Sequence, residues 1–320
     1  MKNLLKISFL TLFTFLAIIG TSCESDDDDE NPIDNSIAGI ASKTANLSIL
    51  VEALNKVNLT TTLTSSGTYT VFAPTNEAFT AFLATTPYAT INDVPDTVLK
   101  EILLNHVIGS VKKSIDLSTG YIKTLGKGAS STTNTLSMFV NVGTNGVTLN
   151  GVSMVTTADI MASNGVIHIV DEVINLPTIV THALANPNFT SLVGALTSAG
   201  QPDFVSILSG TGPFTVFAPT NDAFTALNTE LAPGGIAGVS SSNLTKVLQY
   251  HVVSGGILAS SLTDGQVVQT LQMNQMFTIQ LTTTARIRDA NNRFSTIIAT
   301  DVQCANGVIH VLDKVLLPIL

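Results

Sequence analysis

The ten residues TVFAPTNEAF at positions 70–79 return at 215–224 as TVFAPTNDAF, with Asp222 in place of Glu77. The first half of the stretch alternates as a strand does, and the proline then ends the ladder. The threonine after it is a favoured helix N-cap, and an acid in the first turn suits the helix dipole. The stretch therefore predicts a strand that leads directly into a helix, built twice in one chain.

Each polar residue of this stretch has a structural role in that interpretation. We therefore expect a repeated structural joint, and not a repeated catalytic site. The aromatic rings are expected to be core residues, whose removal leaves a cavity. The residues assigned to the joint are Phe72, Pro74, Thr75 and Phe79 in the first copy and Phe217, Pro219, Thr220 and Phe224 in the second.

A second block repeats in the same order along the chain. Asn105-His106 is matched by Tyr250-His251, and each pair ends a segment whose apolar residues have helical spacing. That spacing places both histidines on the buried face of a helix. We expect neutral imidazoles that are hydrogen-bonded to the backbone, and a ligand-binding role is the alternative.

A third block, Asn-Gly-Val-Ile-His, predicts the last hairpin of each copy. In the first copy the strand 152–160 turns at 163–165 into the strand 166–170, which is apolar on both faces and so buried on both. Further hairpins are predicted to pair 138–142 with 147–149 and 277–281 with 293–300. The residues assigned to this block are Asn164, Gly165, His168 and Asp171, and then Asn306, Gly307, His310 and Asp313.

Three blocks in one order predict tandem domains at 36–177 and 178–320. The three blocks resemble the fasciclin-like domain, twice. That resemblance implies an α+β fold, with each domain a wedge-shaped β-sandwich with packed helices. It also links the Tyr-His pair to cell adhesion. The pair is intact as Tyr250-His251, whereas the first copy has Asn105 in place of tyrosine, which puts that activity in doubt for the first domain.

The N-terminus has the pattern of an export signal. A basic start is followed by an apolar run at 7–19 and by small residues before Cys23. Residues 1–22 therefore predict a signal peptide, and Cys23 resembles the acylated cysteine of a bacterial lipoprotein, although Gly20 departs from the usual Leu, Val or Ile. A secreted protein with an incidental thiol is the alternative. The only other cysteine, Cys304, is expected to be a packed core residue.

Residues 23–35 predict an acidic tether, which holds the domains away from a membrane. This tract resembles the one that directs lipoproteins of Bacteroidetes-type bacteria to the cell surface, so we expect an outer-membrane lipoprotein that is displayed on the cell surface. Seven of the 23 acidic residues lie in this region, and the remaining chain is only mildly acidic. Such a charge balance argues against nucleic acid as a partner.

No catalytic constellation is present in the sequence. There is no Gly-x-Ser-x-Gly nucleophile motif and no His-Glu-x-x-His metal motif. His168 with Asp171 could orient an imidazole, and so could His310 with Asp313, but no nucleophile recurs at a matching place. We therefore expect no enzyme, no cofactor and no metal.

The resemblance implies adhesion, and together with the export pattern it favours a lipid-anchored adhesion module that binds a polysaccharide or another surface protein. An accessory lipoprotein of an envelope complex is the alternative. The chain has no Trp and only 4 Tyr, which leaves few rings for stacking on sugars. The predicted contact region is Tyr250 and His251, with Asn105 and His106 second. Since the histidines are expected to be buried, the partner would touch the flanking residues 252–256.

Overall fold

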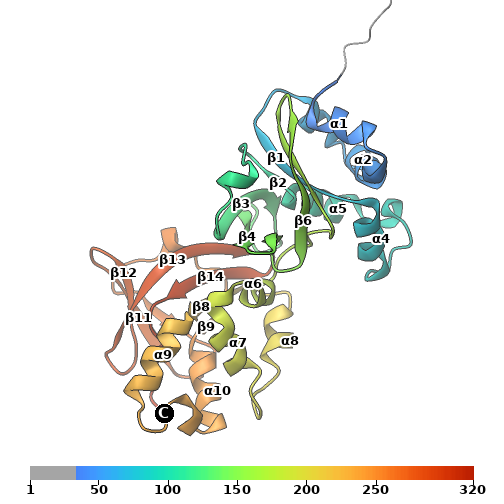
Figure 1. Cartoon of the computed structure of the whole chain (residues 1–320). Helices are drawn as coiled ribbons and strands as arrows, with labels where there is room; N and C mark the ends of the chain where they lie inside the picture. The colour runs from blue at the N-terminus through green and yellow to red at the C-terminus, as the bar shows by residue number, and fades with distance from the viewer. Residues whose placement is uncertain (1–33) are drawn as a thin grey trace, which may run out of the picture. The chain divides into compact units, whose positions relative to one another are not determined.

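The computed structural model describes residues 34–320. The predicted signal peptide at 1–22, Cys23 and all but the last two residues of the predicted tether lie outside the described residues. The described part forms one compact unit, Asp34–Leu320. Within it, two successive series of helices and strands repeat the same order, and we call them the first and the second repeat (Figure 1).

The first repeat begins with helices and ends with a meander of strands. Its helices are α1 (Ile37–Lys43), α2 (Ser48–Lys56), α3 (Thr60–Thr64), α4 (Asn76–Ala84) and α5 (Asp96–Asn105). Its strands are β1 (Tyr69–Pro74), β2 (Val107–Ile108), β3 (Gly120–Lys127), β4 (Thr135–Gly143), β5 (Gly146–Leu149), β6 (Ser153–Ala162) and β7 (Gly165–Val170).

The second repeat has the same succession. Its helices are α6 (Ile179–Ala185), α7 (Thr190–Leu196), α8 (Phe204–Ser209), α9 (Asn221–Glu230) and α10 (Ser241–Tyr250). Its strands are β8 (Phe214–Pro219), β9 (Val252–Ser254), β10 (Val267–Gln269), β11 (Met276–Leu281), β12 (Ala285–Arg288), β13 (Phe294–Cys304) and β14 (Gly307–Leu312).

Each repeat holds one seven-stranded sheet, and the two strand orders are equivalent. The first order is β2-β1-β7-β6-β5-β4-β3, and the second, read from its other end, is β9-β8-β14-β13-β12-β11-β10. Strand β1 pairs with β7 in parallel, and β8 pairs with β14 in the same way. The prediction of two tandem α+β domains is therefore confirmed.

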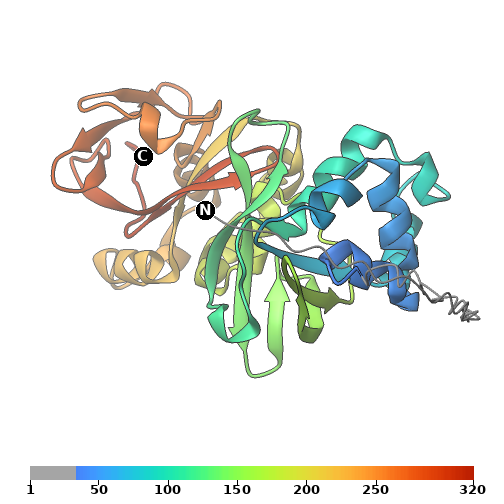
Figure 2. The same cartoon turned by 90° about the horizontal axis from the view of Figure 1, so that it is seen from above.

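Each repeat buries two apolar clusters. In the first repeat one cluster lies between the sheet and the helices α1 to α5, which are the blue and teal helices that gather on one side in Figure 2. The other joins residues of β1, β4, β5 and β7, among them Phe72, Met138, Leu149 and Val170. Since β1 and β4 are far apart in the strand order, the sheet must fold back on itself to bring these side chains together. That is the sandwich core.

One predicted pairing is wrong. We expected 277–281 to pair with 293–300, but β12 lies between them and pairs with both β11 and β13. The four residues of β12 are Ala-Arg-Ile-Arg, and only Ile287 is buried. A strand this short, with one apolar side chain facing inward and arginines facing outward, gives almost no hydrophobic period to recognise.

No single helix of the described residues has the length and hydropathy to cross a membrane. Helix α1 and the helical segment Ala45–Lys56 meet that test only when taken together, across a bend of 111°.

Candidate functional site

The strand–helix joint has the predicted cap in both repeats. The hydroxyl of Thr75 accepts a hydrogen bond from the backbone N–H of Ala78 at 3.2 Å, and Thr220 does the same for Ala223 at 3.3 Å. Phe72 and Phe217 are completely buried. The ring of Phe217 stacks on His310 with 5.2 Å between centroids. The joint therefore carries the packing of each repeat and presents no reactive group.

The asparagine of the third block binds three separate backbone groups. Oδ1 of Asn306 accepts from the N–H of Ile179 at 3.0 Å, and Nδ2 donates to the carbonyls of Leu208 and Gly210, both at 2.8 Å. Asn164 makes the equivalent bonds to Ile37, Leu63 and Ser65. One side chain thus ties the start of the first helix of its repeat, the end of the third and the last hairpin together.

The glycine that follows it is required by close packing of the backbone. A Cβ on Gly307 would lie 2.1 Å from the carbonyl oxygen of Phe214, and one on Gly165 would lie 2.0 Å from that of Tyr69. Both glycines begin the strand that pairs in parallel with the strand of the joint. The TVFAPTN stretch and the Asn-Gly-Val-Ile-His block therefore form neighbouring strands that pack directly against each other in each repeat.

The second-block histidines are buried and hydrogen-bonded at both ring nitrogens. Nε2 of His251 accepts from the N–H of Leu316 at 2.9 Å, so the proton lies on Nδ1, which donates to the carbonyl of Val247 at 2.8 Å. Nε2 of His106 accepts from Ile174 in the same way. Burial lowers the pKa of both histidines to about 4. Each imidazole is neutral at pH 7 and joins a helix end to the C-terminal segment of its repeat.

The residues that precede these histidines are also buried. The Tyr250 hydroxyl donates to the carbonyl of Met276 at 2.7 Å and accepts from the N–H of Ala290 at 3.1 Å, and its side chain has no exposure. Asn105 donates from Nδ2 to the carbonyls of Ile174 and Asn175. A partner therefore cannot touch these side chains in the folded protein. Contact through the flanking segment 252–256 stays a prediction.

The structure does not join His168 with Asp171 or His310 with Asp313. Nδ1 of His168 accepts from the N–H of Asp159 at 3.2 Å, and Nε2 donates to the carbonyl of Lys112 at 2.8 Å. Asp171 instead accepts from the N–H of Met154 at 2.6 Å, and Asp313 accepts from Thr296 at the same distance. Neither carboxylate orients an imidazole for base catalysis. Cys304 has no exposure, and burial raises the pKa of its thiol.

These buried histidines predict a loss of stability in mild acid. The unfolded chain takes up protons near pH 6.5, whereas folded His106 and His251 stay neutral down to about pH 4, and burial lowers the pKa of His182 to about 3. Stability should therefore fall as the pH drops from 6.5 toward 4, by up to about 1.4 kcal/mol per pH unit for each histidine. Urea unfolding at pH 7.5 and pH 5 measures this.

The variant His182→Phe provides the control for that prediction. It removes one of four histidines whose pKa burial lowers, since burial also lowers the pKa of His310, so the dependence on pH should become shallower by roughly a quarter to a third. Equal free energies of unfolding at pH 7.5 and pH 5 would contradict the assignment of neutral buried imidazoles. The exposed carboxyls with lowered pKa values, such as Asp93 and Asp203, act only below about pH 4 and leave this window clear.

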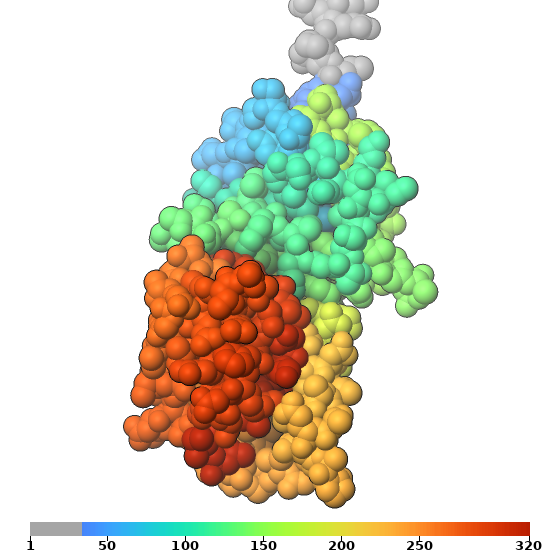
Figure 3. All heavy atoms as spheres, turned by 90° about the vertical axis from the view of Figure 1, so that its left-hand side faces the viewer, coloured from blue at the N-terminus to red at the C-terminus, as the bar shows by residue number. Residues whose placement is uncertain are grey.

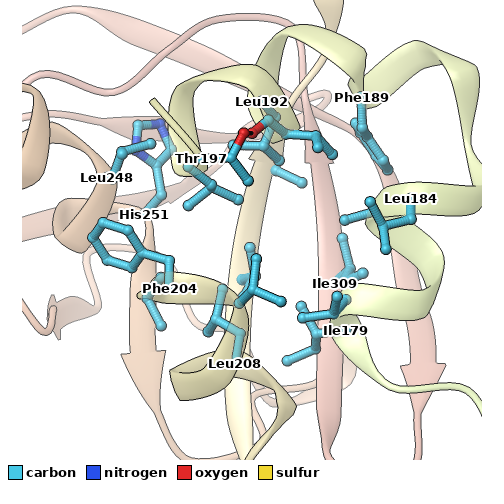
Figure 4. Close-up of a pocket in the computed structure, with 18 residues that line it drawn as sticks. Ile179, Leu184, Phe189, Leu192, Thr197, Phe204, Leu208, Leu248, His251 and Ile309 are labelled. Carbon is cyan, nitrogen blue, oxygen red and sulfur yellow. Dashed lines mark hydrogen bonds between the residues drawn. The ribbon is translucent and has the colours of Figure 1, made fainter. Parts of the chain in front are cut away.

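An apolar cavity lies in the second repeat among α6, α7 and α8. Figure 4 shows its labelled side chains, among them Phe204, Leu192 and His251, turned toward one another. The cavity has a volume of about 40 Å³. That is far below the roughly 300–1,000 Å³ of small-molecule sites. We therefore interpret it as a gap in the packing of the core.

The sequence did not predict which sheet face is free. In the first repeat, Tyr121 and Lys123 of β3 lie opposite Phe139 and Ser137 of β4 on one face. That face is covered by the second repeat, because Ser137 Oγ accepts from the N–H of Gln303 at 3.0 Å. The equivalent strands of the second repeat, β10 and β11, keep the corresponding face exposed within the described residues.

The comparison with protein families decides the assignment. The fasciclin domain model matches residues 45–177 and again 187–318. The chain belongs to the fasciclin domain family. Its two repeats are thus two fasciclin domains.

Relatives of this fasciclin chain occur in bacteria and in animals. It is 40% identical over 143 residues to protein sll1483 of Synechocystis, a match covering 44% of this chain and 73% of the relative. It is 30% identical over 261 residues to human periostin, which covers 79% of this chain and 28% of periostin. A solved fasciclin domain pair, from the insect cell adhesion molecule fasciclin I, has a TM-score of 0.50 and 18% identity over 84% of this chain and 95% of that one.

Proposed function

We propose that this fasciclin chain is a non-enzymatic, exported adhesion module that binds a polysaccharide or another surface protein. The relatives support the adhesive class, because the solved domain pair belongs to a cell adhesion molecule. The repeated motifs support the absence of catalysis, since their four histidines are hydrogen-bonded to the backbone, and the carboxylates of Asp171 and Asp313 accept from backbone N–H groups. The repeated motifs stabilise the fold, and binding takes place on the exposed surface of the domains.

The observation that carries this proposal is the exposed outer face of β10, β11, β12 and the start of β13. Side chains alternate strictly there, with Phe277, Ile279 and Ile287 facing the core. The orange and red segments that build this part of the second repeat form the near surface in Figure 3. The outer face, as we call it, is made by Val267, Gln269, Met276, Thr278, Gln280, Arg286, Arg288 and Phe294.

The composition of the outer face suits a macromolecular partner. The Arg286 guanidinium lies 4.5 Å from the centre of the Phe294 ring, which holds the long side chain against the sheet. Val267 and Met276 are exposed to 59% and 47%. Arginine, methionine and phenylalanine are enriched where proteins meet, and the amides and hydroxyls between them can bind sugar hydroxyls. In the first repeat the equivalent face already binds a neighbouring domain.

We further propose that a lipid on Cys23 anchors the protein in the outer membrane. The acidic residues 23–35 then form a tether between the anchor and the two domains, which lie outside the cell. The export pattern of residues 1–22 supports this. Of the segment that follows the Tyr-His pair, Ser254 and Gly256 are exposed. Ser254 is a second candidate contact, as the sequence suggested.

An array of glycans and surface proteins tests the proposal. The full chain in detergent, checked for a cooperative melt, should bind at least one class of macromolecule on the array. Binding to proteins alone would assign the partner as a surface protein, and binding to glycans alone would assign a polysaccharide. A folded protein that binds nothing, but is recovered from membranes in a fixed complex, would contradict the proposal and favour an accessory role.

A further inference from the structure

A polar pocket of about 320 Å³ opens between the two repeats. The first repeat contributes Lys123 of β3 together with Asn134 and Thr135 at the start of β4, and the second contributes Ser260, Asp301 and Gln303. We propose that this junction pocket binds a neutral, hydroxyl-rich ligand, namely one or two sugar rings. This inference rests on the proposed function and names a small-ligand site within it.

The repeats are held at this point by direct hydrogen bonds. Besides the bond from Gln303 to Ser137, the N–H of Ser130 donates to the carbonyl of Ala305 at 3.0 Å. Nδ2 of Asn186 donates to the Tyr121 hydroxyl at 3.2 Å. Both walls of the pocket are therefore fixed relative to each other by the same strands that line it, which is the preorganisation that a ligand site needs.

The charges of the pocket favour a neutral ligand. Lys123 Nζ donates to the backbone carbonyl of Asp301 at 2.8 Å and to Ser137 Oγ at 3.0 Å, so the ammonium is already hydrogen-bonded. Oδ1 of Asp301 accepts from the N–H of Ala259 at 2.8 Å. The positive charge of Lys123 and the negative charge of Asp301 offset each other, and both groups are already hydrogen-bonded within the protein. An anionic or cationic ligand would therefore find no uncompensated partner.

The pocket also offers hydrogen-bonding groups that the protein leaves free. Gln303 is 1% exposed, and its Nε2 donates to Ser130, Cys304 and Gly307. Its Oε1 has no hydrogen-bond partner among residues 34–320. Because this acceptor has almost no accessible surface, Gln303 forms part of the buried pocket wall, and the groups that a ligand can reach are the side chains of Asn134, Thr135 and Ser260.

Sugars match this lining better than other neutral ligands do. The amide of Asn134 and the hydroxyls of Thr135 and Ser260 can each donate and accept, as sugar hydroxyls do. Leu258 supplies an apolar contact for one edge of a ring. The volume is at the lower end of the range for small-molecule sites, which fits one or two rings. Since no aromatic ring lines the pocket, we expect weak binding by hydrogen bonds.

Saturation-transfer NMR on the full chain in detergent tests this site with maltose, cellobiose, lactose and mannobiose as probes. At least one disaccharide should show transfer. The variant Asn134→Ala/Ser260→Ala removes two polar side chains that line the pocket and make no hydrogen bond to other residues of the described chain. It should weaken binding by about tenfold or more, because two hydrogen bonds are lost. The matched control, Asn188→Ala/Ser209→Ala, makes the same changes at exposed positions outside the pocket and should bind normally.

Two results would overturn the junction site. One is the absence of transfer from all four disaccharides to a protein with a normal melt. The other is equal transfer to the pocket variant and to the control. If the variant loses disaccharides but still binds its partner on the array, the site is real and separate from adhesion. If disaccharides never bind while a surface protein does, the junction site fails and the adhesive function stands.

Discussion

Replacing Phe217 with alanine is expected to destabilise the second domain by about 3–5 kcal/mol. The ring has no exposure, and it packs edge-on against Phe277 with 5.0 Å between centroids and flat against His310. Its strand lies between β9 and β14, so neighbouring side chains cannot close the cavity without moving the sheet. A urea titration of the full chain should show the loss as a lower midpoint for the second domain.

Phe294→Ala is the matched control, because it removes the same ring from the outer face, where the side chain is 42% exposed. We expect it to cost no more than about 1 kcal/mol. Equal effects of the two substitutions would mean that the joint is not the packing centre of the domain, and the explanation of the repeated ten residues would then fail.

Asn306→Leu is expected to lower the free energy of unfolding by at least about 3 kcal/mol, because it leaves three buried backbone groups without a hydrogen-bond partner. The groups are the N–H of Ile179 and the carbonyls of Leu208 and Gly210. The side chain is 5% exposed, so water cannot easily replace the amide. The free energy of unfolding in urea measures this loss.

Asn188→Leu, at an exposed position of the same domain, makes the same chemical change without breaking a side-chain bond within residues 34–320. It should leave the unfolding midpoint nearly unchanged. If Asn306→Leu unfolds at the same urea concentration as Asn188→Leu, the three hydrogen bonds do not stabilise the domain, and the third block would need another explanation.

Much of the fold follows from local rules that the sequence displays. The proline that ends each joint strand and the threonine that follows it predict the start of α4 and α9, and the structure places the cap bonds there. The spacing of apolar residues placed His106 and His251 on buried helix faces, and both are buried. These features depend on neighbours in the chain, so one sequence is enough to predict them.

The surfaces could not be predicted in the same way. Whether a face such as that of Tyr121 and Lys123 is covered depends on contacts with residues far along the chain, such as Gln303. The outer face also requires β12, whose single buried residue gives no period. The junction pocket forms where residues 123–135 of the first repeat lie against residues 258–303 of the second, and no pattern of residue spacing in the sequence predicts that contact.

We propose that the outer face of the second domain binds the partner. The most direct test compares the full chain with Arg286→Glu/Arg288→Glu on the same array, with Lys100→Glu/Lys113→Glu as a control of equal charge change on the first domain. We expect the outer-face variant to lose at least about 90% of the binding, because it reverses two charges at the centre of the contact, and the control to keep it. Binding that is equal in both variants would contradict the claim.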